Sequence, residues 1–138
     1  MLFRNLLLRR LPWLLLFVVL AGIFCLSTSA FSADHTAQIF GPFNHIARKA
    51  AHVTEYAVLF LVLRWTLNKL MPRRNVFAVA VLAVVIATAY AASDEIHQMF
   101  VPNRGPSVFD VCWDASGAVL GACLWAAARA LRRGPRDR

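Results

Sequence analysis

Four long stretches of mostly apolar residues divide the chain, and short polar segments separate them. The stretches cover about residues 11–30, 50–67, 76–98 and 108–128. The hydrocarbon core of a bilayer is about 30 Å thick, so a helix needs roughly 20 apolar residues to cross it. The pattern predicts an all-α fold with a single domain, residues 1–138, formed as an integral membrane bundle of four transmembrane helices.

The composition agrees with this pattern, because 59% of the residues are hydrophobic and the mean hydropathy is +0.58. An ordinary soluble domain is less apolar. The first stretch has a second interpretation as a cleaved signal peptide, since Arg4, Arg9 and Arg10 precede it and residues 28–30 resemble a cleavage site. We favour a retained helix because the apolar run is long for a signal core. We expect Pro12 in its first turn, where no amide donor is needed.

The formal net charge of +8 would suggest a nucleic-acid partner if the protein were soluble. Here the basic residues instead indicate topology, because all 15 except Arg48, Lys49 and Arg104 flank one side of the four stretches. By the positive-inside rule that side is the cytoplasm, so both termini are predicted to be cytoplasmic. We therefore expect a multi-pass protein of the cell membrane with no nucleic-acid partner.

The acidic residues, apart from Asp137, gather at the opposite, non-cytoplasmic side. Ionisable groups inside a membrane span are costly, so they usually face the protein interior or water and indicate function. A spacing of three or four residues places polar side chains on one face of a helix. Three stripes have this spacing: Arg48, His52, Glu55 and Tyr56; Tyr90, Asp94, His97 and Gln98; Asp110 and Asp114.

A pair of glycines favours close packing of the fourth helix. Gly117 and Gly121 form a G-x-x-x-G motif below Asp110 and Asp114, and this motif lets another helix approach closely. Asp114 lies two turns into the stretch and needs a partner there. We expect Arg104, from the turn-rich segment PNRGPS, to fold back over the acids.

Structural interpretations remain open for other members of the stripes. Ser107 with Asp110 resembles a helix-capping box. Glu55 with Arg48 or His52 would form a buried charge pair that fixes helix register. Interfacial aromatic residues are the alternative for Tyr56, Tyr90 and Trp113.

The sequence offers only weak signals for a metal site and none for a disulfide framework. H-x-x-E at residues 52–55 and D-x-x-H at residues 94–97 each place two ligands one helical turn apart, as in carboxylate-bridged metal sites of helix bundles. Such short patterns arise easily by chance, and we expect neither a metal nor a cofactor. Cys25, Cys112 and Cys123 all lie inside the apolar stretches and suggest no disulfide framework.

Two blocks of sequence carry a family resemblance: RKAAHVTEYAVL at residues 48–59 and SDEIHQMFVPNRGPSVFDVCWDASGAVLGA at residues 93–122. Together they resemble the VanZ-like membrane protein family, known for a member associated with teicoplanin resistance. The family's K-x-x-H-x-x-x-Y-x-x-L block is matched by Lys49, His52, Tyr56 and Leu59. Its D-E-x-x-Q-x-F block, arginine-bearing turn and D-x-x-x-[ND]-x-x-G-x-x-x-G helix are matched by Asp94, Glu95, Gln98, Phe100, Arg104, Asp110, Asp114, Gly117 and Gly121.

The resemblance implies a link to the cell envelope and to glycopeptide tolerance, but no established reaction. The polar stripes favour a protein that binds an envelope lipid or a lipid-linked head group in an outward-facing cleft, with the bilayer and such a lipid-linked precursor or a glycopeptide as partners. The ligand-binding candidates are Arg48, Lys49, His52, Glu55, Tyr56, Asp94, Glu95, Gln98, Arg104, Asp110 and Asp114.

Two other functions stay open. The first is an interfacial enzyme that uses general acid–base or metal-assisted chemistry, with candidates His52, Glu55, Asp94, Glu95 and His97. We favour binding over catalysis because the chain has no nucleophile elbow, P-loop or paired-cysteine signature. The second is a structural membrane protein whose polar residues only specify helix packing with a partner complex.

Overall fold

The computed structural model describes residues 2–27, 33–101 and 107–132. These ranges contain helices and turns and no strand, so the prediction of an all-α fold is confirmed. In chain order the elements are α1 (Leu2–Leu26), α2 (Ala33–Phe40), the 3-10 turn η2 (Gly41–Phe43), α3 (Asn44–Leu70), α4 (Val76–Gln98) and α5 (Val108–Arg132).

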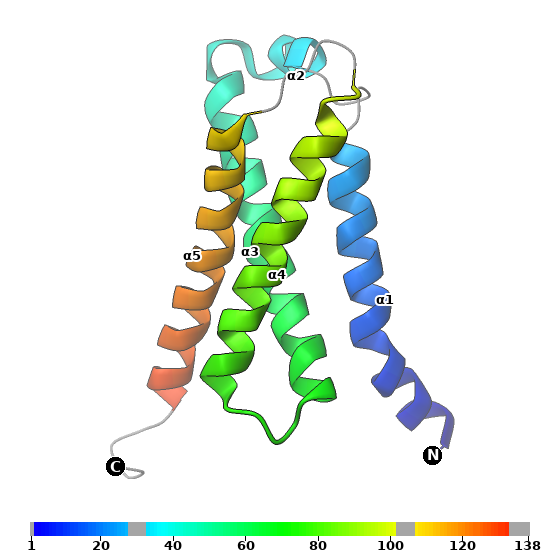
Figure 1. Cartoon of the computed structure of the whole chain (residues 1–138). Coiled ribbons are helices and arrows are strands. Elements are labelled where there is room, and N and C mark those ends of the chain that lie inside the picture. Colours follow the sequence, from blue (N-terminus) through cyan, green and yellow to red (C-terminus); the bar gives the residue numbers. More distant parts are fainter. Residues whose placement is uncertain (1, 28–32, 102–106, 133–138) are drawn as a thin grey trace.

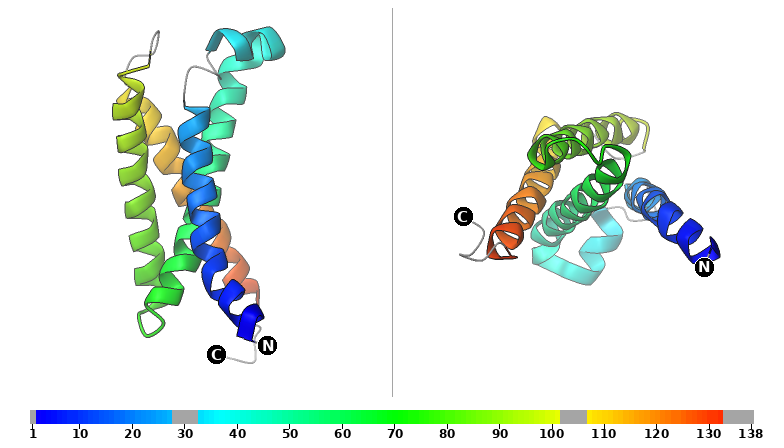
Figure 2. Two further views of the ribbon diagram at one scale, coloured as in Figure 1. Left: turned by 90° about the vertical axis from the view of Figure 1, so that its right-hand side faces the viewer. Right: turned by 90° about the horizontal axis from the view of Figure 1, so that it is seen from below.

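Helix α3 is the centre of the bundle. It contacts α1, α4 and α5, and its contact with α5 is the most extensive of all helix pairs. Figures 1 and 2 show α1 along one side of α3, with α4 and α5 packed on its other sides. The short helix α2 lies at one end of the bundle, near the end of α4 and the start of α5 (Figure 1). We call this the α2 end, and the other end, where α3 turns into α4, the turn end.

The four apolar stretches correspond to α1, α3, α4 and α5, and the bounds of α4 agree with the prediction. Helix α3 begins at Asn44 and α5 continues to Arg132, so both extend beyond their apolar stretches. Helix α1 begins at Leu2, because the residues before the apolar stretch, LFRNLLLRR, are mostly good helix formers. Pro12 therefore lies inside the helix, and our expectation of a first-turn proline was wrong. It is buried, and the Thr66 hydroxyl donates to its carbonyl over 3.4 Å.

Two short elements were not predicted. Helix α2 and the turn η2 lie in the connector between the first two apolar stretches. Gly41, at the start of η2, has a φ of +51°, a backbone conformation that glycine adopts without the steric cost of a side chain. The turn redirects the chain into α3, whose first residues carry the polar side chains of the α2 end.

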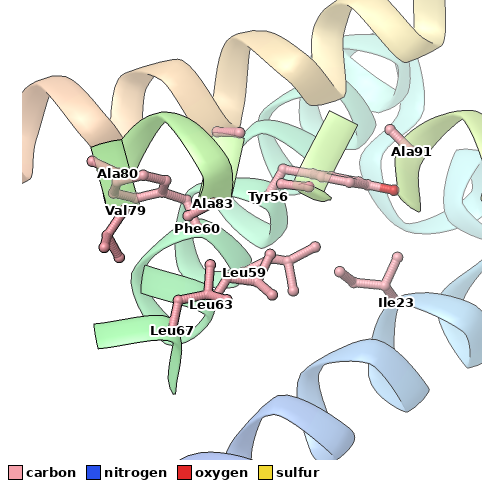
Figure 3. Packing of buried hydrophobic residues seen from close by; sticks show 12 residues of the cluster. Ile23, Tyr56, Leu59, Phe60, Leu63, Leu67, Val79, Ala80, Ala83 and Ala91 are labelled. Carbon is pink, nitrogen blue, oxygen red and sulfur yellow. The ribbon is translucent and has the colours of Figure 1, made fainter. Parts of the chain in front are cut away.

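The core lies between α3 and its neighbours. Large side chains of α3 recur every three or four residues and pack against small residues spaced four apart on α4, namely Ala83, Ala87 and Ala91 (Figure 3). The large residues are Tyr56, Leu59, Phe60 and Leu63, all buried. Alanines on one partner let two helices approach while the larger side chains of the other fill the space between them.

The contact between α3 and α5 depends on two glycines. A Cβ atom added to Gly117 would lie 2.4 Å from the carbonyl oxygen of Val53, and one added to Gly121 would lie 2.9 Å from that of Ala57. Both obstacles are backbone atoms of α3, which cannot move aside as a side chain could. The two helices are therefore in backbone contact along this seam, and both glycines are buried.

Two helices, α4 and α5, are long and apolar enough to cross a membrane. The apolar part of α1, Arg10–Leu26, is shorter, and α3 carries His52, Glu55 and Arg64 within its apolar stretch. Many large hydrophobic side chains of the bundle are exposed, including Phe17, Leu61 and Val85. An exposed apolar surface of this kind suits contact with lipid.

We expect Gly117→Ala to destabilise the bundle, because the methyl group has no space against Val53. Overpacking of this kind costs about 1–3 kcal/mol. The matched control is Gly22→Ala in α1, where nothing lies within 4 Å of the added atom and the higher helix propensity of alanine should leave stability equal or higher. Thermal unfolding in detergent measures both. Equal unfolding temperatures for the two variants would contradict the close contact.

A second prediction concerns the buried phenol of Tyr56. The side chain is fully buried, and its hydroxyl finds no hydrogen-bond partner within the described ranges. An unsatisfied buried hydroxyl costs about 1–3 kcal/mol, so Tyr56→Phe should leave the unfolding temperature of the lipid-free protein equal or higher. Tyr90→Phe is the control, because Tyr90 donates to the Leu20 carbonyl over 2.8 Å and its loss should destabilise. Equal destabilisation by both would show that the Tyr56 hydroxyl has a partner.

Candidate functional site

The first turns of α3 bring cationic and polar side chains to the α2 end. Asn44, His45, Arg48, Lys49 and His52 follow one another at helical spacing. Residues three or four apart lie on the same side of a helix, so these side chains form one surface that continues from the turn η2 down into the bundle.

Helix α5 supplies the opposite charge. Asp110 and Asp114 lie one turn apart near its start, and the contact seam at Gly117 continues the same face. Lys49 donates to Asp110 through an ion pair, and His52 Nδ1 lies 3.1 Å from Asp114 Oδ1. The two pairs are one turn apart on both helices. They connect α3 to α5 directly above the glycine contact.

A cavity of about 590 Å³ opens between these helices, and we call it the main cavity. Its polar lining combines cations, carboxylates and amides, and Phe109 and Trp113 of α5 supply apolar area. Lys49 Nζ lies 6.0 Å from the centre of the Trp113 ring, close enough for a cation–π contact. The full lining is Asn44, His45, Arg48, Lys49, His52, Gln98, Ser107, Phe109, Asp110, Trp113 and Asp114.

The acids of α4 lie beside the main cavity and contact structural partners. Asp94 is 3% exposed and accepts hydrogen bonds from the Ser27 hydroxyl over 2.6 Å and from Gln98 Nε2 over 2.8 Å. Glu95 Oε1 accepts from the backbone amide of Ser107 over 2.5 Å. Asp94 thus ties the end of α1 to α4, and Glu95 holds the residue from which α5 begins.

The remaining candidates lie on other surfaces. Glu55 is half-buried one turn below His52. Tyr56 belongs to the core and does not line the main cavity. The ring of His97 stacks on Phe24 of α1, with 4.3 Å between ring centres, and His97 does not line the main cavity. Arg104, which we expected to fold over the acids, lies outside the described residues.

A second, smaller cavity of about 170 Å³ lies on the other side of α3, and we call it the side cavity. Arg48 and His52 line both cavities, so the two cavities adjoin at these side chains. The side cavity is closed by the end of α1 and by α2, through Leu26, Ser27, Thr36 and Phe40.

The side cavity continues into an apolar groove of about 710 Å³ between α1 and α3. Both are lined by Leu26, Phe40, Ala47, Ala51 and Glu55. Farther along, the groove is lined by hydrophobic side chains of the two helices, among them Val18, Val19, Ile23 and Val58. The main cavity and the side cavity therefore share Arg48 and His52, and the side cavity leads on into the hydrophobic groove.

Six of the ligand-binding candidates come together in the main cavity, namely Arg48, Lys49, His52, Gln98, Asp110 and Asp114. Asn44 and His45 were not predicted as site residues, although they precede Arg48 by one turn and repeat its spacing. Ser107 and Trp113, for which the sequence favours a cap and an interfacial aromatic, also line the main cavity. Phe109 lines it too, and no pattern in the sequence indicates this.

The arrangement offers donors and acceptors to one ligand. Arginine and lysine suit an oxyanion such as phosphate, and the arginine fork can donate two parallel hydrogen bonds. Carboxylates accept hydrogen bonds from hydroxyl or amino groups. Within the described ranges, no group of three His, Cys, Asp or Glu side chains converges in a way that would hold a metal ion.

Comparison with protein families gives one clear result. Residues 10–129, nearly the whole chain, match the model of the VanZ/LLP1 family. Neither the curated proteins nor the solved structures include a significant match. Together with the two membrane-capable helices, this match indicates a membrane protein. The chain therefore belongs to the VanZ/LLP1 family.

Proposed function

We propose that this protein binds an envelope lipid or a lipid-linked head group at the α2 end of the bundle. One observation carries the proposal: the main cavity, whose lining includes cations, carboxylates and amides, shares Arg48 and His52 with the side cavity that leads into the apolar groove. A molecule with a charged head and a hydrophobic tail matches both environments. The head would occupy the main cavity, and the tail would lie along α1 and α3.

The charges of the main cavity support a phosphate-containing head group. Arg48 lines both compartments, where its fork would contact a phosphate at the junction of head and tail. Asp110 and Asp114 would accept hydrogen bonds from sugar hydroxyls or amino groups beyond the phosphate. Trp113 and Phe109 offer flat apolar surfaces on which a sugar ring can stack.

The proposal includes a topology with four membrane crossings and both termini in the cytoplasm. The distribution of Lys and Arg supports it, because the α2 end carries far fewer cations than the turn end. Helix α3 would cross the membrane with its polar residues turned toward α5 and the cavities. The main cavity would then face the non-cytoplasmic side of a multi-pass protein in the cell membrane.

Family membership adds the physiological part of the proposal. The VanZ-like family is known for a member associated with teicoplanin resistance. We extend to this protein the link with the envelope and with glycopeptide tolerance. A lipid-linked precursor in the main cavity would connect the two.

An enzymatic alternative rests on the contact between His52 and Asp114. A carboxylate 3.1 Å from one ring nitrogen of a histidine can orient the ring so that the other nitrogen acts as a general base. His52 also lines the main cavity, where it would meet the head group. A purely structural role, in which the two ion pairs only fix the register of α3 and α5, is the third possibility.

We expect Arg48→Gln to reduce the amount of co-purified lipid about tenfold, which is the loss expected for a charge-assisted hydrogen bond. The control is Lys69→Gln, which removes an exposed cation at the turn end. Lipid-resolved mass spectrometry of protein purified in mild detergent measures the effect, and thermal unfolding checks the fold. If neither variant changes the retained lipid, the main cavity is not the binding site.

The same preparation separates the alternatives. A retained lipid with an unmodified head group supports binding, whereas conversion of that lipid by the wild type but not by His52→Ala supports an enzyme. If His52→Ala, Glu55→Gln and Asp114→Asn lower thermal stability and no lipid co-purifies with the wild type, the polar residues serve only helix packing.

The topology predicts opposite accessibility for two single cysteines. The three native cysteines are exposed and form no disulfide, so they can be replaced by alanine to give a thiol-free background. In intact cells a membrane-impermeant maleimide should label Ala37→Cys in α2. It should label Arg73→Cys, at the turn end, only after permeabilisation. Both positions are exposed, and the reverse pattern would contradict the orientation.

A further inference from the structure

The turn end holds a second polar cavity, of about 680 Å³, that is separate from the main cavity. It lies where α3 and α5 end and α4 begins. Its polar lining consists of Arg64 and Asn68 from α3 and of Arg129 and Arg132 from α5. We call it the arginine cavity. The proposed function at the α2 end does not use any of these residues.

An indole holds two of the arginines close together. The guanidinium of Arg64 lies 4.5 Å from the centre of the Trp125 ring, and that of Arg129 lies 5.9 Å from the same ring. Phe77 of α4 packs edge-on against Trp125, with 5.9 Å between ring centres, and so fixes the indole. Cation–π contacts position both guanidinium groups but leave their charges unneutralised.

No acid compensates these charges within the described ranges. From Tyr56 to Ser93, and from Ala115 to Arg132, the sequence contains neither Asp nor Glu. The Nε atoms of Arg64 and Arg129 are buried and have no hydrogen-bond partner among the described residues. Buried donors are normally satisfied, and two cations in a partly desolvated cavity repel each other. The excess of positive charge in this cavity therefore favours an anion.

The shape and chemistry of the cavity select among anions. Guanidinium groups match the tetrahedral oxygens of phosphate, and Asn68 adds an amide donor. Leu61 and Leu124 line the same cavity on the side toward the middle of the bundle, three residues before Arg64 and five residues before Arg129 respectively. An occupant with a phosphate at the turn end and an apolar part along the helices fits this lining.

We propose that the arginine cavity binds the phosphate group of an anionic phospholipid. The head group would lie between Arg64 and Arg129, and an acyl chain would continue past Leu61 and Leu124. Basic pockets between helices at a membrane surface are a known way to recognise such head groups. A free phosphate presents the same oxygens without the chain, so the two sources differ in a measurable way.

The test uses the full chain in detergent and native mass spectrometry with phosphatidylglycerol, with phosphatidylcholine and with inorganic phosphate. We expect the protein to retain phosphatidylglycerol in preference to phosphatidylcholine, and the double variant Arg64→Gln, Arg129→Gln to lose about tenfold or more of that retention. Arg73→Gln with Arg74→Gln is the matched control. It removes the same charge from exposed positions at the same end and should change retention less than about twofold.

Each result of this experiment either supports or overturns the binding of a phospholipid in the arginine cavity. Equal losses in the two double variants would show diffuse attraction to a basic surface and would overturn it. Competition by inorganic phosphate that abolishes lipid retention would assign the cavity to free phosphate and overturn the lipid part. A structural role of the arginines predicts a lower unfolding temperature for the Arg64→Gln, Arg129→Gln protein without lipid, whereas relief of their repulsion predicts an equal or higher one.

A second variant keeps the test valid if that protein does not fold. Arg64→Lys retains the charge but loses the planar fork, so it should keep the fold and still reduce phosphatidylglycerol retention. Unchanged retention in Arg64→Lys would contradict recognition by the fork. These measurements leave the main cavity intact, so they can succeed or fail independently of the proposed function.

Discussion

The backbones of α3 and α5 can touch only because positions 117 and 121 carry no side chains. This contact sets the distance between the two helices where they meet. One turn above it, Asp114 reaches His52, and one turn farther Asp110 reaches Lys49. Below it, Arg129 and Arg64 meet on Trp125. The polar chemistry at both ends of the bundle therefore depends on a seam that contains no polar side chain.

The two ends of the bundle have opposite electrostatic character. At the α2 end the described cations lie opposite carboxylates, and the ion pairs leave a cavity of mixed charge. At the turn end, all the charged side chains among the described residues are cations. Mixed charge favours a ligand with several polar groups, whereas an excess of cations favours a simple anion. One α3–α5 interface would thus support the two proposed recognition chemistries, one for each proposed leaflet of the membrane.

Sequence periodicity was sufficient to predict the four long helices, but it predicted neither α2 nor the contacts that polar side chains make between helices. The uniform apolar character of residues 76–98 defines α4, and Asn75 accepts a hydrogen bond from the Phe77 amide at its start. The first turns of α3 are polar, so hydropathy could not show that the helix begins at Asn44. The roles of Asp94 and Glu95 depend on Ser27 and Ser107, and nothing in their own helix indicates these contacts.

The ion pair between Lys49 and Asp110 joins residues that are 61 positions apart in the sequence. In a partly buried site, loss of one partner leaves an uncompensated charge, whereas exchange of both for apolar residues can be nearly neutral. A substitution at either position is therefore tolerated only when the residue at the other position changes with it. Across related sequences, these two columns should vary together, and so should the columns of His52 and Asp114. Such covariation would indicate that related proteins have kept the same α3–α5 contacts at the main cavity.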